Sequence, residues 1–212
     1  MRKIETSRKV VTRSGRHVRY LYSSIKNGAL VQCESRLELD AAMHFEFDPS
    51  VLRYREQPEL VTYHDRLGCS RKYYPDFELA MSDGTLLHIE VKPVEKMRKA
   101  SLQERFEDIS AHYARARRLF RILTELEVQR EPRRTNLERL SYHRRATPFG
   151  FELSSLLDRL SDVRPLTLEA VDEELGNPKL TMRMIAAGHL TCDLDRPIDA
   201  STLLEVRRGR QA

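Results

Sequence analysis

Residues 71–92 read RKYYPDFELAMSDGTLLHIEVK, and this stretch decides the fold. Side chains alternate between the two faces of a β-strand, and residues 85–92 follow that pattern. One face carries Leu87, Ile89 and Val91, and the other carries His88, Glu90 and Lys92. Ser82-Asp83-Gly84 is typical of a hairpin turn. We therefore expect residues 71–80 to form a strand that pairs with residues 85–92.

The hairpin pairing is expected to bring Asp76 close to Glu90. Two carboxylates on neighbouring strands offer hard oxygen ligands, which suit Mg²⁺ or Mn²⁺. Lys92 beside them can orient an attacking water and offset the negative charge that develops on a phosphate. Pro75-Asp76 followed by Glu90-x-Lys92 is the PD-(D/E)xK arrangement of restriction-like nucleases. Each half alone is common on unrelated strands, so a chance match is the alternative.

The flanking segments predict the rest of a nuclease core. A helix is expected from about Glu34 to Phe47, because Leu37, Ala41 and Phe45 recur at helical spacing before Asp48-Pro49. A strand is expected over 58–65, a long helix over 101–118 and a fourth strand over 119–124. The order helix, three-strand meander, helix, strand predicts an α/β or α+β restriction-endonuclease-like core with a mixed central sheet.

The second half of the chain is expected to be mainly helical. Helices are predicted over about 131–145, 150–161, 167–175 and 179–187, followed by two short extended pieces. This order is winged-helix-like. Four parts result: a basic arm (1–30), a catalytic core (31–127), a basic linker and helix (128–148) and a winged-helix-like domain (149–212).

Charge is distributed unevenly along the 212 residues, whose formal net charge is +5. The segments 1–30, 31–89, 90–150 and 151–212 carry net charges of +7, −5, +6 and −3. Basic zones favour a phosphate-bearing partner such as DNA, although solvated arginine-rich helices are the alternative. No apolar run approaches the roughly 18 residues of a membrane span, no secretory signal is evident, and three scattered cysteines suggest a reduced cytoplasmic protein.

Several short motifs, in this order and spacing, resemble TnsA, the endonuclease subunit of heteromeric cut-and-paste bacterial transposases. They are Glu34-Ser35-Arg36-Leu37-Glu38, Phe47-Asp48-Pro49-Ser50-Val51, Glu56-Gln57-Pro58, Tyr74-Pro75-Asp76-Phe77 and Ile89-Glu90-Val91-Lys92-Pro93. The resemblance implies a DNA endonuclease that cuts the 5′ ends of the transposon. It also implies one or two Mg²⁺ ions, with Mn²⁺ as a substitute.

The resemblance implies a role for each matching residue. Glu38, Asp76 and Glu90 would hold the metal, and Lys92 would be the catalytic lysine. Glu34 lies one helical turn before Glu38 and is the alternative to it. His88 shares the face of Glu90 and is a weaker candidate for substrate contact.

The same resemblance implies partners. These are DNA at the transposon ends, a D-D-E transposase (TnsB-like) and an AAA+ ATPase regulator (TnsC-like) that the C-terminal domain engages. Weaker candidates for DNA contact are Lys96, Arg98, Lys99, Arg13, Arg16 and Arg19. A stand-alone repair or restriction nuclease and a non-catalytic DNA-binding adaptor are the alternative functions.

Overall fold

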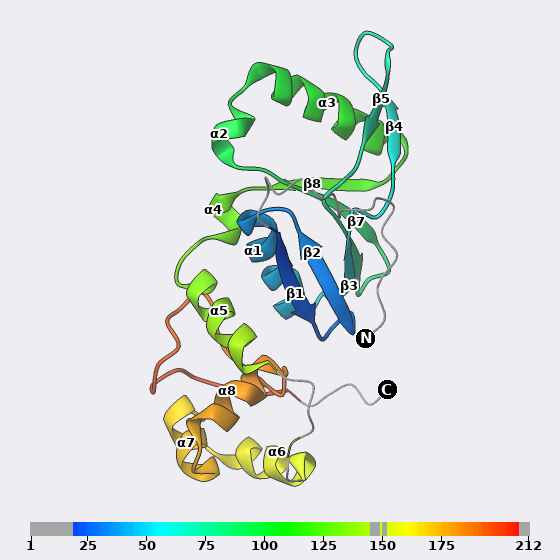
Figure 1. The fold of residues 1–212 in the computed structure, drawn as a ribbon. Helices are drawn as coiled ribbons and strands as arrows, with labels where there is room; N and C mark the ends of the chain where they lie inside the picture. The colour runs from blue at the N-terminus through cyan, green and yellow to red at the C-terminus, as the bar shows by residue number, and fades with distance from the viewer. Residues whose placement is uncertain (1–18, 145–148, 150–151, 208–212) are drawn as a thin grey trace. The chain divides into compact units, whose positions relative to one another are not determined.

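The protein divides into two compact units, Met1–Arg130 and Glu131–Ala212 (Figure 1). The computed structural model describes residues 19–144, 149 and 152–207. Each unit has its own buried apolar residues, so each is described by itself. The expected end of the catalytic core, residue 127, lies close to the boundary between the units.

A four-stranded mixed sheet forms the centre of the first unit. In spatial order its strands are β3 (Val51–Glu56), β6 (Phe77–Met81), β7 (Leu86–Val91) and β8 (Leu119–Leu123). β7 and β8 are parallel and the other pairs are antiparallel. A parallel pair needs a long crossover, which α2 (Val94–Met97) and α3 (Ala100–Arg115) supply. This mixed α/β arrangement fits a restriction-like core.

The predicted strand over 71–80 is wrong, because the chain breaks it in two. β5 (Ser70–Tyr73) pairs with β4 (Val61–His64) in a separate hairpin, and β6 starts only at Phe77. The break contains Pro75, whose nitrogen carries no hydrogen to donate to a strand ladder. Both pairings of the expected meander are present, β4 with β5 and β6 with β7, but they lie in two separate sheets.

The strand β3 was not predicted, although it is an edge of the central sheet and pairs with β6. Its apolar residues do not alternate regularly, because the register shifts between Val51 and Arg53. Such a bulge disturbs the two-residue period on which sequence patterns depend.

The helix α1 (Arg36–Phe47) covers one face of the sheet, as Figure 1 shows. The Ser35 hydroxyl accepts a hydrogen bond from the Glu38 amide at 3.1 Å, which caps the first turn. Leu37, Ala41 and Phe45 are buried in one cluster with the apolar face of β7. The expected helix and its core face are confirmed.

The hairpin of β1 (Tyr20–Ser24) and β2 (Ala29–Cys33) is fastened to α1 through Glu46. This buried carboxylate accepts hydrogen bonds from Ser24 Oγ at 2.6 Å, Tyr54 Oη at 2.7 Å and the amides of residues 25 and 26 at 2.9 and 3.0 Å. The hairpin crosses the expected boundary of the basic arm at residue 30. Residues 1–18 of that arm lie outside the described residues.

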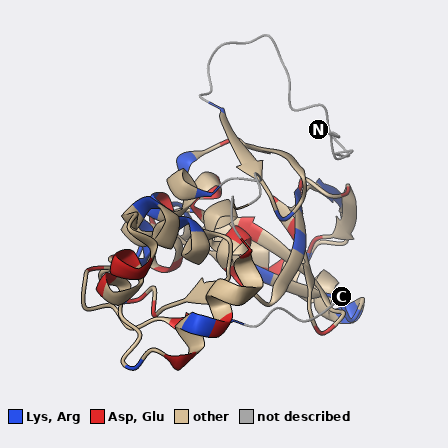
Figure 2. Cartoon of the chain, turned by 90° about the horizontal axis from the view of Figure 1, so that it is seen from below, with Lys and Arg blue, Asp and Glu red and all other residues tan. Residues whose placement is uncertain are grey.

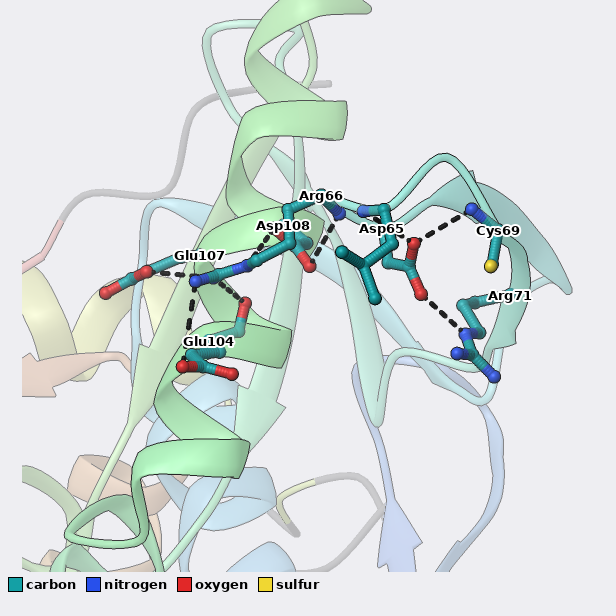
Figure 3. Close-up of polar contacts among 8 residues, drawn as sticks. Asp65, Arg66, Cys69, Arg71, Glu104, Glu107 and Asp108 are labelled. Atoms are coloured by element: carbon teal, nitrogen blue, oxygen red, sulfur yellow. Dashed lines mark hydrogen bonds and ion pairs between the residues drawn. The ribbon is translucent and has the colours of Figure 1, made fainter.

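The helix α3 and the β4–β5 hairpin cover the other face of the sheet. Their shared apolar cluster contains Val61, Tyr63, Tyr73, Phe106, Ile109 and Tyr113. Near the tip of the hairpin, Arg66 reaches α3, where it meets Glu107 at 3.1 Å and Asp108 at 3.3 Å (Figure 3). Apolar packing and ion pairs thus hold the hairpin on α3.

The described residues of the second unit form four helices and a short two-stranded ribbon. They are α5 (Arg133–His143), α6 (Leu153–Asp162), α7 (Leu168–Leu175), α8 (Pro178–Ala186), β9 (Leu190–Thr191) and β10 (Glu205–Val206). α8 packs against α5 and α7, and most of its residues are buried. The helices and the ribbon follow the expected order, and the winged-helix-like arrangement stays a prediction.

Acidic and basic residues are interspersed along the described ribbon (Figure 2). Within the described ranges, no helix has the length and apolar character that a membrane span requires.

Candidate active site

Asp76 lies in the short link between β5 and β6, and backbone contacts fix it on both sides. The pairing of Phe77 with Ile89 places it next to the end of β7. The Val91 amide donates a hydrogen bond to Asp76 Oδ2 at 2.7 Å, and the Gln57 amide donates to the Asp76 carbonyl at 2.9 Å. The link that breaks the predicted strand is therefore what aims the carboxylate at β7.

Lys92 contacts the carboxylates of both Asp76 and Glu90. Its Nζ lies 2.5 Å from Glu90 Oε1 and 3.4 Å from Asp76 Oδ2. Its own amide donates to the Leu123 carbonyl at 3.0 Å, which fixes the end of β7 against β8. The structure thus brings together Asp76, Glu90 and Lys92, three of the four residues predicted to act in catalysis.

Burial and crowding shape the electrostatics of this cluster. Burial, with the neighbouring Asp76, raises the pKa of Glu90 to about 7. Burial likewise raises the pKa of Asp76, and Lys92 opposes that shift. Burial alone would lower the pKa of Lys92, but the two carboxylates raise it above its ordinary value. A half-buried cation is held here between acids that repel one another, which is an environment typical of functional sites.

Glu38 already has a structural task at the start of α1. Its Oε2 accepts from the Glu34 amide at 2.7 Å and its Oε1 accepts from Ser35 Oγ at 2.8 Å. Together with the bond from its own amide to Ser35, these contacts close the first turn of α1. Burial and the charge of Asp76 raise the pKa of Glu38 to about 7.

Glu34, the alternative to Glu38, is also directed toward the cluster. It is exposed, its Oε1 accepts from Gln57 Nε2 at 3.2 Å, and its charge helps to raise the pKa of Asp76. Gln57 adopts a φ of 40°, a left-handed conformation that is costly for a non-glycine residue. The choice between Glu34 and Glu38 stays a prediction.

The donor set fits a Mg²⁺ ion held by two carboxylates. In the part of the chain that the structure describes, no group of three or more His, Cys, Asp or Glu residues is arranged to hold a metal. Mg²⁺ usually takes only one or two carboxylates, with water and substrate phosphate as its other ligands. Asp76 and Glu90 could supply those two, and a cation would relieve their mutual repulsion.

Tyr73 is a polar neighbour that the sequence reasoning missed. Its hydroxyl donates to Glu90 Oε2 at 2.5 Å, and both side chains are buried. Burial and the charge of Glu90 raise the pKa of Tyr73 well above its usual value, so the phenol stays protonated. The sequence places a tyrosine two residues before Pro75, but the contact depends on the unpredicted break at Pro75, which leaves Tyr73 in a hairpin outside the central sheet.

His88 is fully buried, which rules out the suggested contact with substrate. Its Nε2 lies 3.0 Å from Arg118 and 3.2 Å from Glu78. Burial and the charge of Arg118 lower the pKa of His88, so the ring is neutral at pH 7.

The structure describes four of the six weaker candidates for DNA contact. Lys96, Arg98 and Lys99 are exposed in and directly after α2, the helix that follows the site. Arg19 lies just before β1 and is half-buried, whereas Arg13 and Arg16 fall outside the described residues.

Comparison with known proteins finds a family that resembles this part of the chain. Residues 48–125 match a family model described as TnsA-like endonuclease N terminal. Over this stretch the chain resembles TnsA. The matched stretch contains Asp76, Glu90 and Lys92, and it ends before the second unit begins. A search of curated proteins found no match. The family match supports a nuclease related to the endonuclease subunits of transposases.

Proposed function

We propose that the protein is the DNA endonuclease subunit of a heteromeric transposase, which hydrolyses the 5′ ends of the transposon during cut-and-paste transposition. The observation that carries this proposal is the contact of Lys92 with both Asp76 and Glu90 inside the TnsA-like stretch. A solvated strand face would not hold a half-buried lysine against two acids.

Each side chain has a task in phosphodiester hydrolysis. Asp76 and Glu90 would hold Mg²⁺, or Mn²⁺ in its place, with Glu38 or Glu34 at the outer edge of the site. The ion supplies Lewis-acid chemistry to the phosphate when bound. Lys92 would place a positive charge where negative charge develops on the phosphate. The Val91 amide holds Asp76 in place throughout.

The second unit is proposed to bind protein partners of the transposase. Residues 151–212 carry a net charge of −3 and residues 131–150 carry +3, so the unit has no net positive charge to favour tight binding to duplex DNA. α8 buries five of its nine residues, which leaves little of its surface for a DNA groove. We propose a winged-helix-like docking domain for an AAA+ ATPase regulator (TnsC-like), and a D-D-E transposase (TnsB-like) that cuts the 3′ ends. The setting is the bacterial cytoplasm.

Phosphate contacts are proposed for exposed basic residues near the site. Lys96, Arg98 and Lys99 follow Lys92 closely, so they could contact the DNA backbone beside the cut. The basic residues Arg13, Arg16 and Arg19 of the N-terminal segment are proposed to contact DNA further along.

Cleavage by the reconstituted transposase with Mg²⁺ tests the proposal. We expect Asp76→Ala and Lys92→Ala each to reduce 5′-end cutting by roughly a hundredfold or more, while the partner still cuts the 3′ ends. Lys72→Ala, at an exposed lysine on β5, is the matched control and should cut normally. Undiminished 5′ cutting by both site variants would refute the assignment.

The same assay separates the alternatives. A stand-alone nuclease would cut plain DNA without partners. A DNA-binding adaptor would bind the ends and leave both 5′ strands intact even in the complete system.

A further inference from the structure

We propose that Tyr73, from the β4–β5 hairpin outside the central sheet, is a positioning residue that fixes the orientation in which Glu90 binds metal. The inference rests on the proposed function, because Glu90 is a metal ligand only in that function.

The two oxygens of Glu90 are each held by a different donor. Tyr73 Oη donates to Oε2 and Lys92 Nζ lies against Oε1, both at 2.5 Å. A carboxylate offers about four lone-pair sites, so these two donors fix its orientation and still leave lone pairs for an ion. Ligating carboxylates are commonly held in this way by hydrogen-bond partners behind them.

The phenol of Tyr73 is held independently of Glu90. Its ring packs edge-on against Phe120 at a centroid distance of 6.2 Å and belongs to the apolar cluster beneath α3. The tip of the same hairpin is fastened to α3 by Arg66, whose Nη2 donates to the Glu104 carbonyl at 2.9 Å (Figure 3). The donor therefore has a fixed position, and the carboxylate must conform to it.

Tyr63 provides a matched comparison within the same hairpin. It is buried in the same cluster, with 4% of its surface exposed against 3% for Tyr73. The two tyrosines differ in that the hydroxyl of Tyr73 donates the hydrogen bond to Glu90. Removing the hydroxyl from each tyrosine in turn separates an effect on Glu90 from a general effect on the hairpin.

The experiment measures Mn²⁺ binding by the full-length protein, from the electron paramagnetic resonance signal of the free ion. We expect Tyr73→Phe to weaken binding about tenfold or more, and Tyr63→Phe to bind like the wild type. Thermal unfolding of both variants is measured alongside. We expect Tyr73→Phe also to raise the Mg²⁺ concentration needed for half-maximal 5′ cutting, without loss at saturating Mg²⁺.

A double variant tests whether Tyr73 acts through Glu90. In a Glu90→Ala background, Tyr73→Phe should weaken the remaining Mn²⁺ binding no further. A further tenfold loss there would overturn the inference, since it would mean that the hydroxyl supports the fold and not the ligand. This comparison holds even if Tyr73→Phe lowers the unfolding temperature.

Two further results would be decisive. If Tyr73→Phe binds Mn²⁺ as tightly as the wild type while Asp76→Ala does not, the inference fails and the proposed function stands. If Asp76→Ala leaves Mn²⁺ binding unchanged, the proposed metal site fails and the inference fails with it.

Discussion

Glu38 shows how one carboxylate can serve both a helix and a candidate metal site. Both of its oxygens accept hydrogen bonds at the start of α1, yet Asp76 lies near enough to raise its pKa. Loss of activity after its removal would therefore not by itself show metal binding. A Gln side chain keeps a carbonyl oxygen that can accept a hydrogen bond but carries no charge, which allows the two tasks to be separated.

We expect Glu38→Gln to keep the helix cap and to weaken Mg²⁺ binding, because the amide preserves an acceptor but removes the charge. The unfolding temperature at pH 5 should be unchanged, while the half-saturating Mg²⁺ concentration for 5′ cutting rises about tenfold. Glu38→Ala should lose the cap too, at roughly 1 kcal/mol of stability. Glu34→Gln is the control; a larger effect there than in Glu38→Gln would assign the metal-site role to Glu34.

The raised pKa of Glu38 predicts how stability depends on pH. The folded value is about 7 and the ordinary value is 4.5, so the folded state binds this proton more tightly. Stability should therefore fall as the pH rises from about 4.5 to 7. Relative to Glu38→Gln, the wild type should lose up to about 3 kcal/mol across this window. Urea unfolding of both proteins in a chelator at pH 5 and pH 7.5 measures this loss. An equal change in the free energy of unfolding of the wild type and of Glu38→Gln between these pH values would contradict it.

At the scale of elements, α1 and the β1–β2 hairpin depend on Glu46, whose buried carboxylate gathers four donors from the hairpin turn and β3. We expect Glu46→Gln to destabilise the protein by about 2–3 kcal/mol, because the NH₂ group of Gln would replace one of the two accepting oxygens and would itself face hydrogen-bond donors. Chemical denaturation measures this change. Glu95→Gln, at an exposed acid in α2, should change stability by less than about 0.5 kcal/mol.

The elements that the sequence could predict are those with an uninterrupted period. α1 and β7 repeat their apolar residues regularly, so both faces of β7 and the side of α1 that packs on it were foreseen. β3 carries a bulge and was missed, and residues 71–80 run through Pro75, which separates two sheets. Asp76 and Glu90 were predicted to meet because a turn joins their strands. The Tyr73 contact could not be predicted, since the strand over 71–80 was expected to be continuous and the β4–β5 hairpin instead forms a separate sheet.

At the scale of the whole molecule, the family match covers only residues 48–125 and ends before the second unit. The first unit contains the complete four-stranded sheet and both of its covering layers. We expect a fragment of residues 1–130 to unfold in a single cooperative transition in calorimetry and to bind Mn²⁺ like the full chain. A fragment without a transition would show that the nuclease unit needs residues 131–212 in order to fold.

The hairpin tip also offers a chemical handle. Of the three cysteines in the chain, Cys69 is exposed at this tip, whereas Cys33 is buried and burial raises the pKa of Cys192 to about 11. A maleimide fluorophore at neutral pH should therefore react first at Cys69, without any engineered thiol. The dye would sit on the same hairpin as Tyr73, so its emission could report on that hairpin while metal and DNA bind.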